Sequence, residues 1–432
     1  MFFIPMSARR MTGALTMALL ASTANAEELT LAQAVQASLK QDAWLVANQK
    51  QQQAAIALSE GATALPDPKI TLGLLNMPTD SFDFEQEAMT QLSLQVTQML
   101  PVGDTLEINR QQHRVSAQQA VWQRQNRVAL IKKQVTQLWL KAYQAQQALR
   151  IVEQSRPLFE QLNDAVAGHY RASYGATRQQ DLVRAELELG KLEQRLMTLK
   201  QSRDEALSQL KQYLPEQAAE EMTLPQERLA QPDTSMQAMQ TVDLNKQLAQ
   251  HPLVKLMDER THGARLEQSL EEQKYKPQFG VSLGYGYRGE APNGDDRADL
   301  ASLAVSVSMP IFSSKRQDAA VLAARLQAES LLSDKTLLLN ELQSRYQVIN
   351  SNWQQLQQRE AQYQTQLLPQ YQASSEAALN AYTRDDGPFV DIVQARIAEL
   401  NARVELLNIQ VAQHQQAAEL NYLLTSSEGA QS

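Results

Sequence analysis

The stretch Pro277–Tyr287, Pro-Gln-Phe-Gly-Val-Ser-Leu-Gly-Tyr-Gly-Tyr, alternates large apolar side chains with glycine and serine. This period-two pattern predicts a β-strand with one apolar face and one small polar face. Similar alternation recurs at 70–74, 92–96 and 303–307. Strands of about 9–11 residues suit a tilted crossing of a membrane. The apolar faces point either into a soluble sandwich or toward lipid, and four strands cannot close a barrel within one chain.

The chain repeats itself. Pro68 matches Pro277, Pro101 matches Pro310 and Leu94 matches Leu303, all at one sequence offset. Further pairs follow in the same order at a slightly larger offset: Pro157 with Pro369, Tyr170 with Tyr382, Gly175 with Gly387, and Asp181–Ala185 with Asp391–Ala395. Several matches in one order indicate two structural repeats.

Each half is predicted to hold a helix of moderate length, two strands, a very long helix, and another moderate helix. The predicted helices are Leu29–Ala64, Asp104 to about Ser173, Arg178–Leu214 and Asn245–Tyr275. Because the two moderate helices together match the long one in length, we expect them to stack end to end beside it. Pro157 and Pro369 are expected to kink the long helices at matching places.

The beginning of the chain resembles a targeting signal rather than a structural element. Arg9 and Arg10 precede an apolar run over 11–21, and Ala24-Asn25-Ala26 offers small residues for cleavage. These are the parts of a secretory signal peptide. We therefore expect a signal peptide over 1–26, a first repeat over 27–214, a linker over 215–244, a second repeat over 245–426, and a tail over 427–432.

Composition narrows the function classes. The 432 residues carry a net charge of −8, no cysteine and five histidines, none of which share the short spacing of a zinc or copper site. The acidic balance argues against nucleic acid as the main partner. No nucleophile–base pair or metal-ligand cluster stands out, so we expect neither an enzyme nor a bound cofactor. No stretch reaches the roughly 18–20 apolar residues of a membrane-spanning helix.

These features together resemble the TolC-like outer-membrane efflux family. The resemblance rests on the signal peptide, the duplicated helix–strand–strand–helix–helix order, and the prolines that enter and leave the strands. A Tyr-x4-Gly motif followed by Asp, as in Tyr382, Gly387 and Asp391, is similar to that family's helix-turn-helix signature. The match covers nearly all of the mature chain. The order and the duplication of the motifs are more specific than any single motif.

The resemblance implies a mainly α-helical fold with a small β part. Duplicated long helical hairpins and four membrane strands per chain would form a homotrimer with a twelve-strand β-barrel in outer-membrane lipid and a hollow α-helical barrel in the periplasm. The partners implied are a periplasmic adaptor protein and an inner-membrane pump of the RND type. Because the chain has no cysteine, we expect no acyl anchor.

In this arrangement the segments 76–87 and 288–297 become extracellular loops. Their acidic residues either attract cations to the mouth of a channel or simply keep the loops soluble. The acids of the first loop are Asp80, Asp83, Glu85 and Glu87, and those of the second are Glu290, Asp295 and Asp296.

The opposite end would be the periplasmic tip, where the helical hairpins reverse. Gly175 and Gly387 would permit the reversals, with Pro388 as a first helical residue. The acids Asp385 and Asp386 of the second turn either line the entrance and contact the adaptor or are solvated turn residues.

The lumen-facing gate is implied one turn further into the helices. Family members carry two acids three residues apart there, whereas this chain has Asp391 followed by Gln394, and Asp181 followed by Arg184 in the first half. Asp391 either forms a threefold ring of carboxylates or only complements the helix dipole, and for Asp181 we favour the second role. Arg184 would pair with a neighbouring carboxylate and hold the tip closed.

Short segments beside the predicted strands bear on the substrate. Leu65-Pro66-Asp67-Pro68-Lys69, Asn76-Met77-Pro78 and Met89-Thr90 resemble the heavy-metal branch of these channels, which favours metal cations. The alternative substrates are drugs or other small organic molecules. A periplasmic adaptor or structural protein built on a helical hairpin is a different reading, which two hairpins and four strands fit less well.

Overall fold

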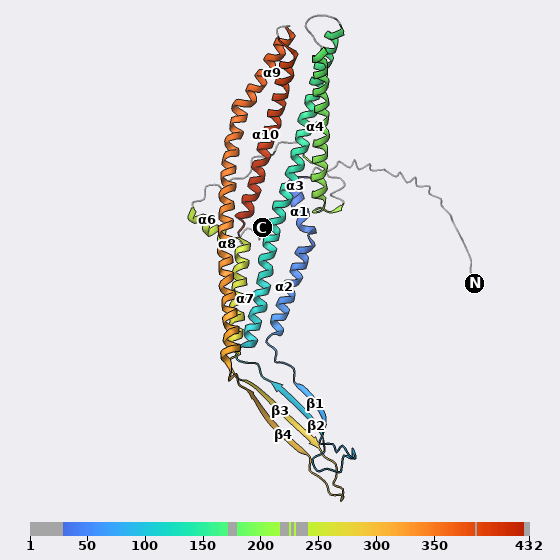
Figure 1. Ribbon diagram of the computed structural model, residues 1–432, viewed down its shortest axis with the longest axis vertical. Helices are drawn as coiled ribbons and strands as arrows, with labels where there is room; N and C mark the ends of the chain where they lie inside the picture. The colour runs from blue at the N-terminus through green and yellow to red at the C-terminus, as the bar shows by residue number, and fades with distance from the viewer. Residues whose placement is uncertain are drawn as a thin grey trace, which may run out of the picture.

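The computed structural model describes residues 29–171, 179–216, 224–225, 229, 241–384 and 387–426. Long helices run side by side along the molecule, and a four-stranded sheet extends beyond one end of them (Figure 1). The predicted signal peptide, most of the predicted linker and the predicted tail over 427–432 lie outside the described residues.

The order of elements occurs twice along the chain. The first series is α1 (Leu31–Gln41), α2 (Ala43–Gly61), β1 (Lys69–Leu75), β2 (Gln91–Met99), α3 (Thr105–Arg171) and α4 (Gln179–Lys211). The second is α6 (Thr241–Ala249), α7 (Pro252–Gln273), β3 (Gln278–Tyr287), β4 (Leu300–Ser308), α8 (Ser313–Gln362), the π-helical turn η1 (Tyr363–Leu367), α9 (Leu368–Thr383) and α10 (Phe389–Leu423). The prediction of a mainly helical chain with four strands is confirmed.

The moderate helices stack end to end, as expected from their lengths. Helices α1 and α2 contact one part of α3 and α4 contacts the rest, while α7 and α10 divide α8 in the same way (Figure 1). The prediction of single helices over 29–64 and 245–275 was wrong, because each is broken. Asp42 is extended and caps α2, and Pro252 disfavours helical backbone at the preceding His251.

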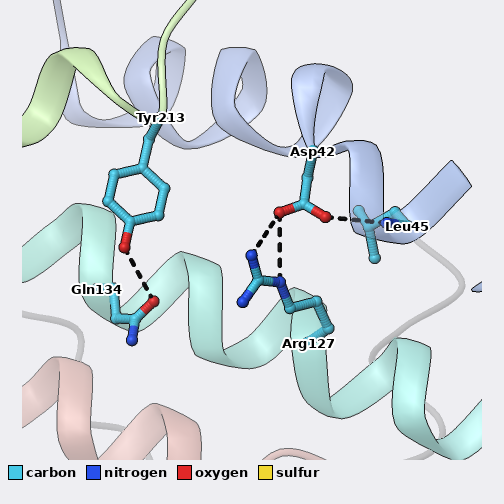
Figure 2. A network of polar contacts seen from close by, with 5 residues as sticks. All are labelled: Asp42, Leu45, Arg127, Gln134 and Tyr213. Carbon is cyan, nitrogen blue, oxygen red and sulfur yellow. Dashed lines mark hydrogen bonds and ion pairs between the residues drawn. The ribbon is translucent and has the colours of Figure 1, made fainter. Parts of the chain in front are cut away.

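The break at Asp42 is tied to the long helix beside it. Its carboxylate accepts bonds from the Arg127 guanidinium, the shorter at 2.7 Å, and from the Leu45 amide at 2.9 Å (Figure 2). Further along α3, Gln134 accepts a 3.3 Å bond from the Tyr213 hydroxyl, just after α4 (Figure 2). These contacts hold α2 and the end of α4 against α3, near the place where the stacked helices meet.

The strands form an antiparallel sheet in the order β1-β2-β3-β4. The two hairpins differ in register. Leu72 pairs with Leu94, whereas Val281, which corresponds to Leu72 at the offset between Pro68 and Pro277, pairs with Val305. In the structure Leu94 therefore corresponds to Val305 rather than to Leu303, the match that sequence alone suggested. The strand pairing therefore shows which residues of the two hairpins are equivalent. The sequence match of Leu94 with Leu303 arose because the prolines of the two repeats were aligned.

The long helices keep the offset that relates Leu94 to Val305. Buried residues of α3 and α8 that correspond at this shifted offset are Ala117 and Ala328, Ile131 and Leu342, Val135 and Tyr346, and Ala142 and Trp353. The π-helical turn then holds one more residue than an α-helical turn, which moves Pro369 one position beyond the equivalent of Pro157. Of the two predicted kinks, Pro369 follows this widened turn, whereas Pro157 lies inside α3, which remains helical on both sides of it.

The apolar core lies between the helices. Its largest cluster packs Trp139, Ile131 and Val135 of α3 against α1 and α4, and Trp139 donates a 3.0 Å bond to the Leu29 carbonyl. Within the described ranges, none of the helices combines the length and the apolar character needed to cross a bilayer.

Candidate functional site

The sheet has an apolar face that no described helix covers. Its register aligns Ile70, Val96, Leu283 and Leu303 in one row across the four strands. Of their side chains, Ile70 is 67% exposed and Leu303 is 70% exposed. None of the apolar core clusters found among the described residues includes a strand residue. A soluble sandwich would bury these side chains, so the single chain leaves the face without its partner.

The other face of the sheet is small and polar. The hydroxyls of Thr97 and Ser282 are hydrogen bonded at 2.9 Å across the β2–β3 pair. The glycines of β3 leave room for neighbouring side chains on this face. A Cβ atom at Gly280 would lie 2.6 Å from the Met99 sulfur, and one at Gly284 would overlap the Ser302 hydroxyl. This face suits contact with water.

Two arginines join the loops at the far end of the sheet. The Arg297 guanidinium donates to the carbonyls of Glu85 (3.2 Å) and Glu87 (3.0 Å) in the other loop. Arg288 bonds to the Ala88 and Ala298 carbonyls. Sequence analysis did not single out these arginines, although two bases within acidic loops could have suggested cross-linking.

The acids of the first loop form no ion pair within the described part of the chain. Asp80, Asp83, Glu85 and Glu87 are all exposed. Because both arginines bond to backbone carbonyls, they hold the loops together without neutralising the carboxylates one by one. The arrangement is compatible with both predicted roles of these acids, attraction of cations and solubility of the loops.

At the opposite end, an apolar cluster orients the start of α10. Phe389, Ile392 and Val393 pack with Leu162 of α3 and Ala185 of α4, among others. Since Ile392 and Val393 are buried, Asp391 and Gln394 lie on the exposed face of α10. The structure thus presents both residues to the exterior of the single chain.

The turn before α10 differs in detail from the prediction. Pro388 is the residue that caps α10 rather than its first helical residue, and it supplies no side-chain bond. A Cβ atom at Gly387 would lie 3.0 Å from the Ala381 Cβ, so glycine serves close packing here rather than a left-handed backbone. Asp391, in the first turn of α10, remains compatible with either a gate or a dipole-complementing role.

Two of the matching first-half residues lie at the start of α4. Asp181 lies half-buried in the first turn of α4, and Arg184 is exposed. No ion pair joins Arg184 to another residue in the described part of the chain. Gly175, Asp385 and Asp386 lie outside the described residues. The apolar cluster at this end nevertheless brings the starts of α4 and α10 to the same end of the molecule (Figure 1).

No group of three or more His, Asp or Glu side chains in the described residues could hold a metal ion.

Comparison with known proteins places the fold. No family model matches the chain, and no curated protein matches it. Solved structures do match. A CusC crystal structure is 14% identical with a TM-score of 0.74 and covers 93% of each chain. The outer-membrane channel OprN is 16% identical with a TM-score of 0.75, covering 92% of this chain and 90% of its own. The CmeC outer-membrane channel of Campylobacter jejuni is 12% identical with a TM-score of 0.74, covering 98% and 93%. At these identities the likeness shows a shared fold.

Proposed function

We propose that three copies of this chain form a channel in the outer membrane that continues through the periplasm and passively conducts substrate out of the cell. The observation that carries the proposal is the uncovered four-stranded sheet. Its outer strands β1 and β4 are both edges, and they run antiparallel to each other. Strand β4 of one copy can therefore pair with β1 of the next, and repetition closes a ring.

Three copies supply twelve strands, enough for a closed wall with an interior channel. The exposed apolar row would then face lipid, and the Ser/Gly/Thr face would line water. Similarity to solved outer-membrane channels over nearly the whole chain supports this reading. The chain itself performs no chemistry, so an inner-membrane pump of the RND type and a periplasmic adaptor would supply energy and deliver substrate.

For the substrate we propose metal cations. The support is the resemblance of 65–69 and 76–78 to the heavy-metal branch, together with the exposed acids of the loops. Asp391 would add one carboxylate per copy around the threefold axis at the periplasmic tip. Drugs and other small organic molecules are the alternative cargo.

The test is a deletion strain challenged with metal salts and with organic toxins, while the protein is located by membrane fractionation. Recovery in the outer membrane with sensitivity to metal salts supports the proposal as stated. Sensitivity to organic toxins alone overturns the metal assignment. Recovery in the soluble periplasm overturns the channel.

A further inference from the structure

One side of α8 lacks the neighbour that the same side of α3 has. At the sheet end of the helical layer, α3 contacts both α2 and α7, and α7 in turn contacts α8. The lateral order is therefore α2, α3, α7, α8. Helix α3 is covered on both sides, whereas this part of α8 and the outer side of α2 form the two free flanks of the chain among its described elements.

The contact between α3 and α7 shows how the two repeats pack. Ile108 and Val115 of α3 are buried against Leu266 of α7. The Gln112 amide donates a 2.7 Å bond to Glu267, and a Cβ atom at Gly263 would lie 3.5 Å from Val115. The residue numbers decrease along α7 as they increase along α3, so the two helices are antiparallel.

The sequence offsets between the repeats identify the residues on the free sides of α2 and α8 that are equivalent to those in this contact. At the offset between Pro68 and Pro277, the caps Asp42 and His251 correspond. At that same offset, Gly263 and Glu267 of α7 correspond to Ala54 and Leu58 of α2. At the shifted offset of the buried positions in the long helices, Val115 of α3 corresponds to Leu326 of α8.

Exposure agrees with a missing neighbour. Val115 is 7% exposed, whereas Leu326 is 52% exposed; Leu58 is 57% exposed. The α8 residues that correspond to Ile108, Gln112, Val115 and Gln119 of α3 are all exposed: Ala319, Ala323, Leu326 and Ser330. Ser333 and Leu337, about one and two turns further along the same side of α8, are exposed as well. The matching α2 residues are exposed as well: Ala47, Gln51, Ala54, Ala57, Leu58 and Gly61. We call these two sets the α8 flank and the α2 flank.

The flanks complement each other in size and charge. Neither contains a charged residue, although the rest of α8 exposes Arg325 and Glu329 close by. The α8 flank projects leucines, and the α2 flank offers alanines and one glycine that leave room for them. A surface free of charge and rich in apolar side chains is suited to burial rather than to solvent.

We infer that the α8 flank of one copy packs antiparallel on the α2 flank of the next copy, in the register in which α3 packs on α7, with Leu326 against Ala54 and Ala323 beside Leu58. The inference rests on the proposed channel and adds which surfaces meet and in which register. The contact is head-to-tail, so it closes into a ring in the same direction as the pairing of β4 with β1.

Engineered disulfides test the register, since the chain has no cysteine of its own. The interchain pair is Ala54→Cys with Leu326→Cys. The matched intrachain control is Gly263→Cys with Val115→Cys, at the corresponding place between α7 and α3. The off-register control is Ala54→Cys with Gln327→Cys, because Ser116, which corresponds to Gln327, stays exposed in α3.

After mild oxidation in detergent, the Ala54/Leu326 pair should give covalent dimers and trimers on a non-reducing gel, and the off-register pair should give mostly single chains. The Gly263/Val115 pair should give an intrachain disulfide. A native trimer whose Ala54/Leu326 pair remains unlinked, while the intrachain control forms, overturns this register and leaves the channel standing. A folded monomer overturns both.

Disruption of the flank gives an independent readout. Leu326→Asp should lower the temperature at which trimers dissociate on native gels, whereas Gln327→Asp should leave it within a few degrees of the parent. Helical circular dichroism separates dissociation from unfolding. Equal dissociation temperatures for both folded variants overturn the inference.

Discussion

Asp42 and His251 occupy equivalent positions in the two repeats and do the same local task with different chemistry. The Asp42 carboxylate accepts a 2.9 Å bond from the Leu45 amide at the start of α2, and His251 Nδ1 accepts a 3.2 Å bond from the Leu253 amide at the start of α7. Both residues break a moderate helix of their repeat. One break is held by an ion pair to α3, and the other by a buried neutral ring.

The buried His251 is expected to make the stability of the protein depend on pH. Burial lowers the pKa of its imidazole to about 4, with nearby Arg345 acting in the same direction. Because the unfolded chain takes up this proton near pH 6.5 and the folded chain only near pH 4, stability is retained above pH 6.5 and lost as the pH falls toward 4. The loss should approach about 1.4 kcal/mol per pH unit within that window.

His251→Asn keeps a capping acceptor but cannot titrate. We expect its melting temperature, followed by helical circular dichroism, to fall less than that of the parent between pH 7 and pH 5. An identical fall in both proteins would show that His251 does not carry this dependence.

Removing the Asp42 carboxylate is expected to cost more stability than protonating His251. Its side chain is 9% exposed and that of Arg127 is 33% exposed. Asp42→Ala removes a helix cap and leaves Arg127 without its partner, which should cost about 2–4 kcal/mol in chemical denaturation. Asp42→Asn retains the cap and should cost less. Equal losses for the two variants would assign the effect to the ion pair with Arg127 rather than to the cap.

Asp391 predicts ion selectivity at the tip. In planar bilayers at low salt, Asp391→Ala should raise conductance through the closed channel or weaken its preference for cations, and Gln394→Glu should strengthen that preference. The change should reach roughly tenfold if three carboxylates line the axis. If conductance and selectivity are unchanged in both variants, Asp391 acts only at the start of its helix.

The loop acids predict a salt-dependent effect. Replacing Asp80, Asp83, Glu85 and Glu87 with their amides should reduce cation preference near 0.1 M salt, where screening extends over about 10 Å. The difference should vanish near 1 M, where screening acts within about 3 Å. A selectivity that is already equal to the parent's at low salt would show that these acids serve solubility instead.

The sequence predicted the elements better than their breaks. Alternation located all four strands, because glycine and serine opposite leucine and tyrosine leave little ambiguity. The break at His251 could have been foreseen from Pro252, which disfavours a helical residue before it. The π-helical turn could not be located, since the longer offset at Pro369 shows extra length without showing where the helix widens.

The residue types of the candidate sites could be predicted from the sequence, but their exposure and their contacts could not. The acidic residues of the loops are evident in the sequence, but their lack of ion pairs with other described residues depends on where Arg288 and Arg297 point. Likewise, Asp391 was recognisable by its spacing from Gly387, whereas its exposure depends on the burial of Ile392 and Val393. The free flanks of α2 and α8 required the structure, because strand register changed the offset between the repeats.

The central claim is that one chain cannot close its own sheet. Native mass measurement of the protein in mild detergent tests it most directly. The account predicts a particle of three chains whose strands resist protease. A stable particle of one chain with equally protected strands would contradict it.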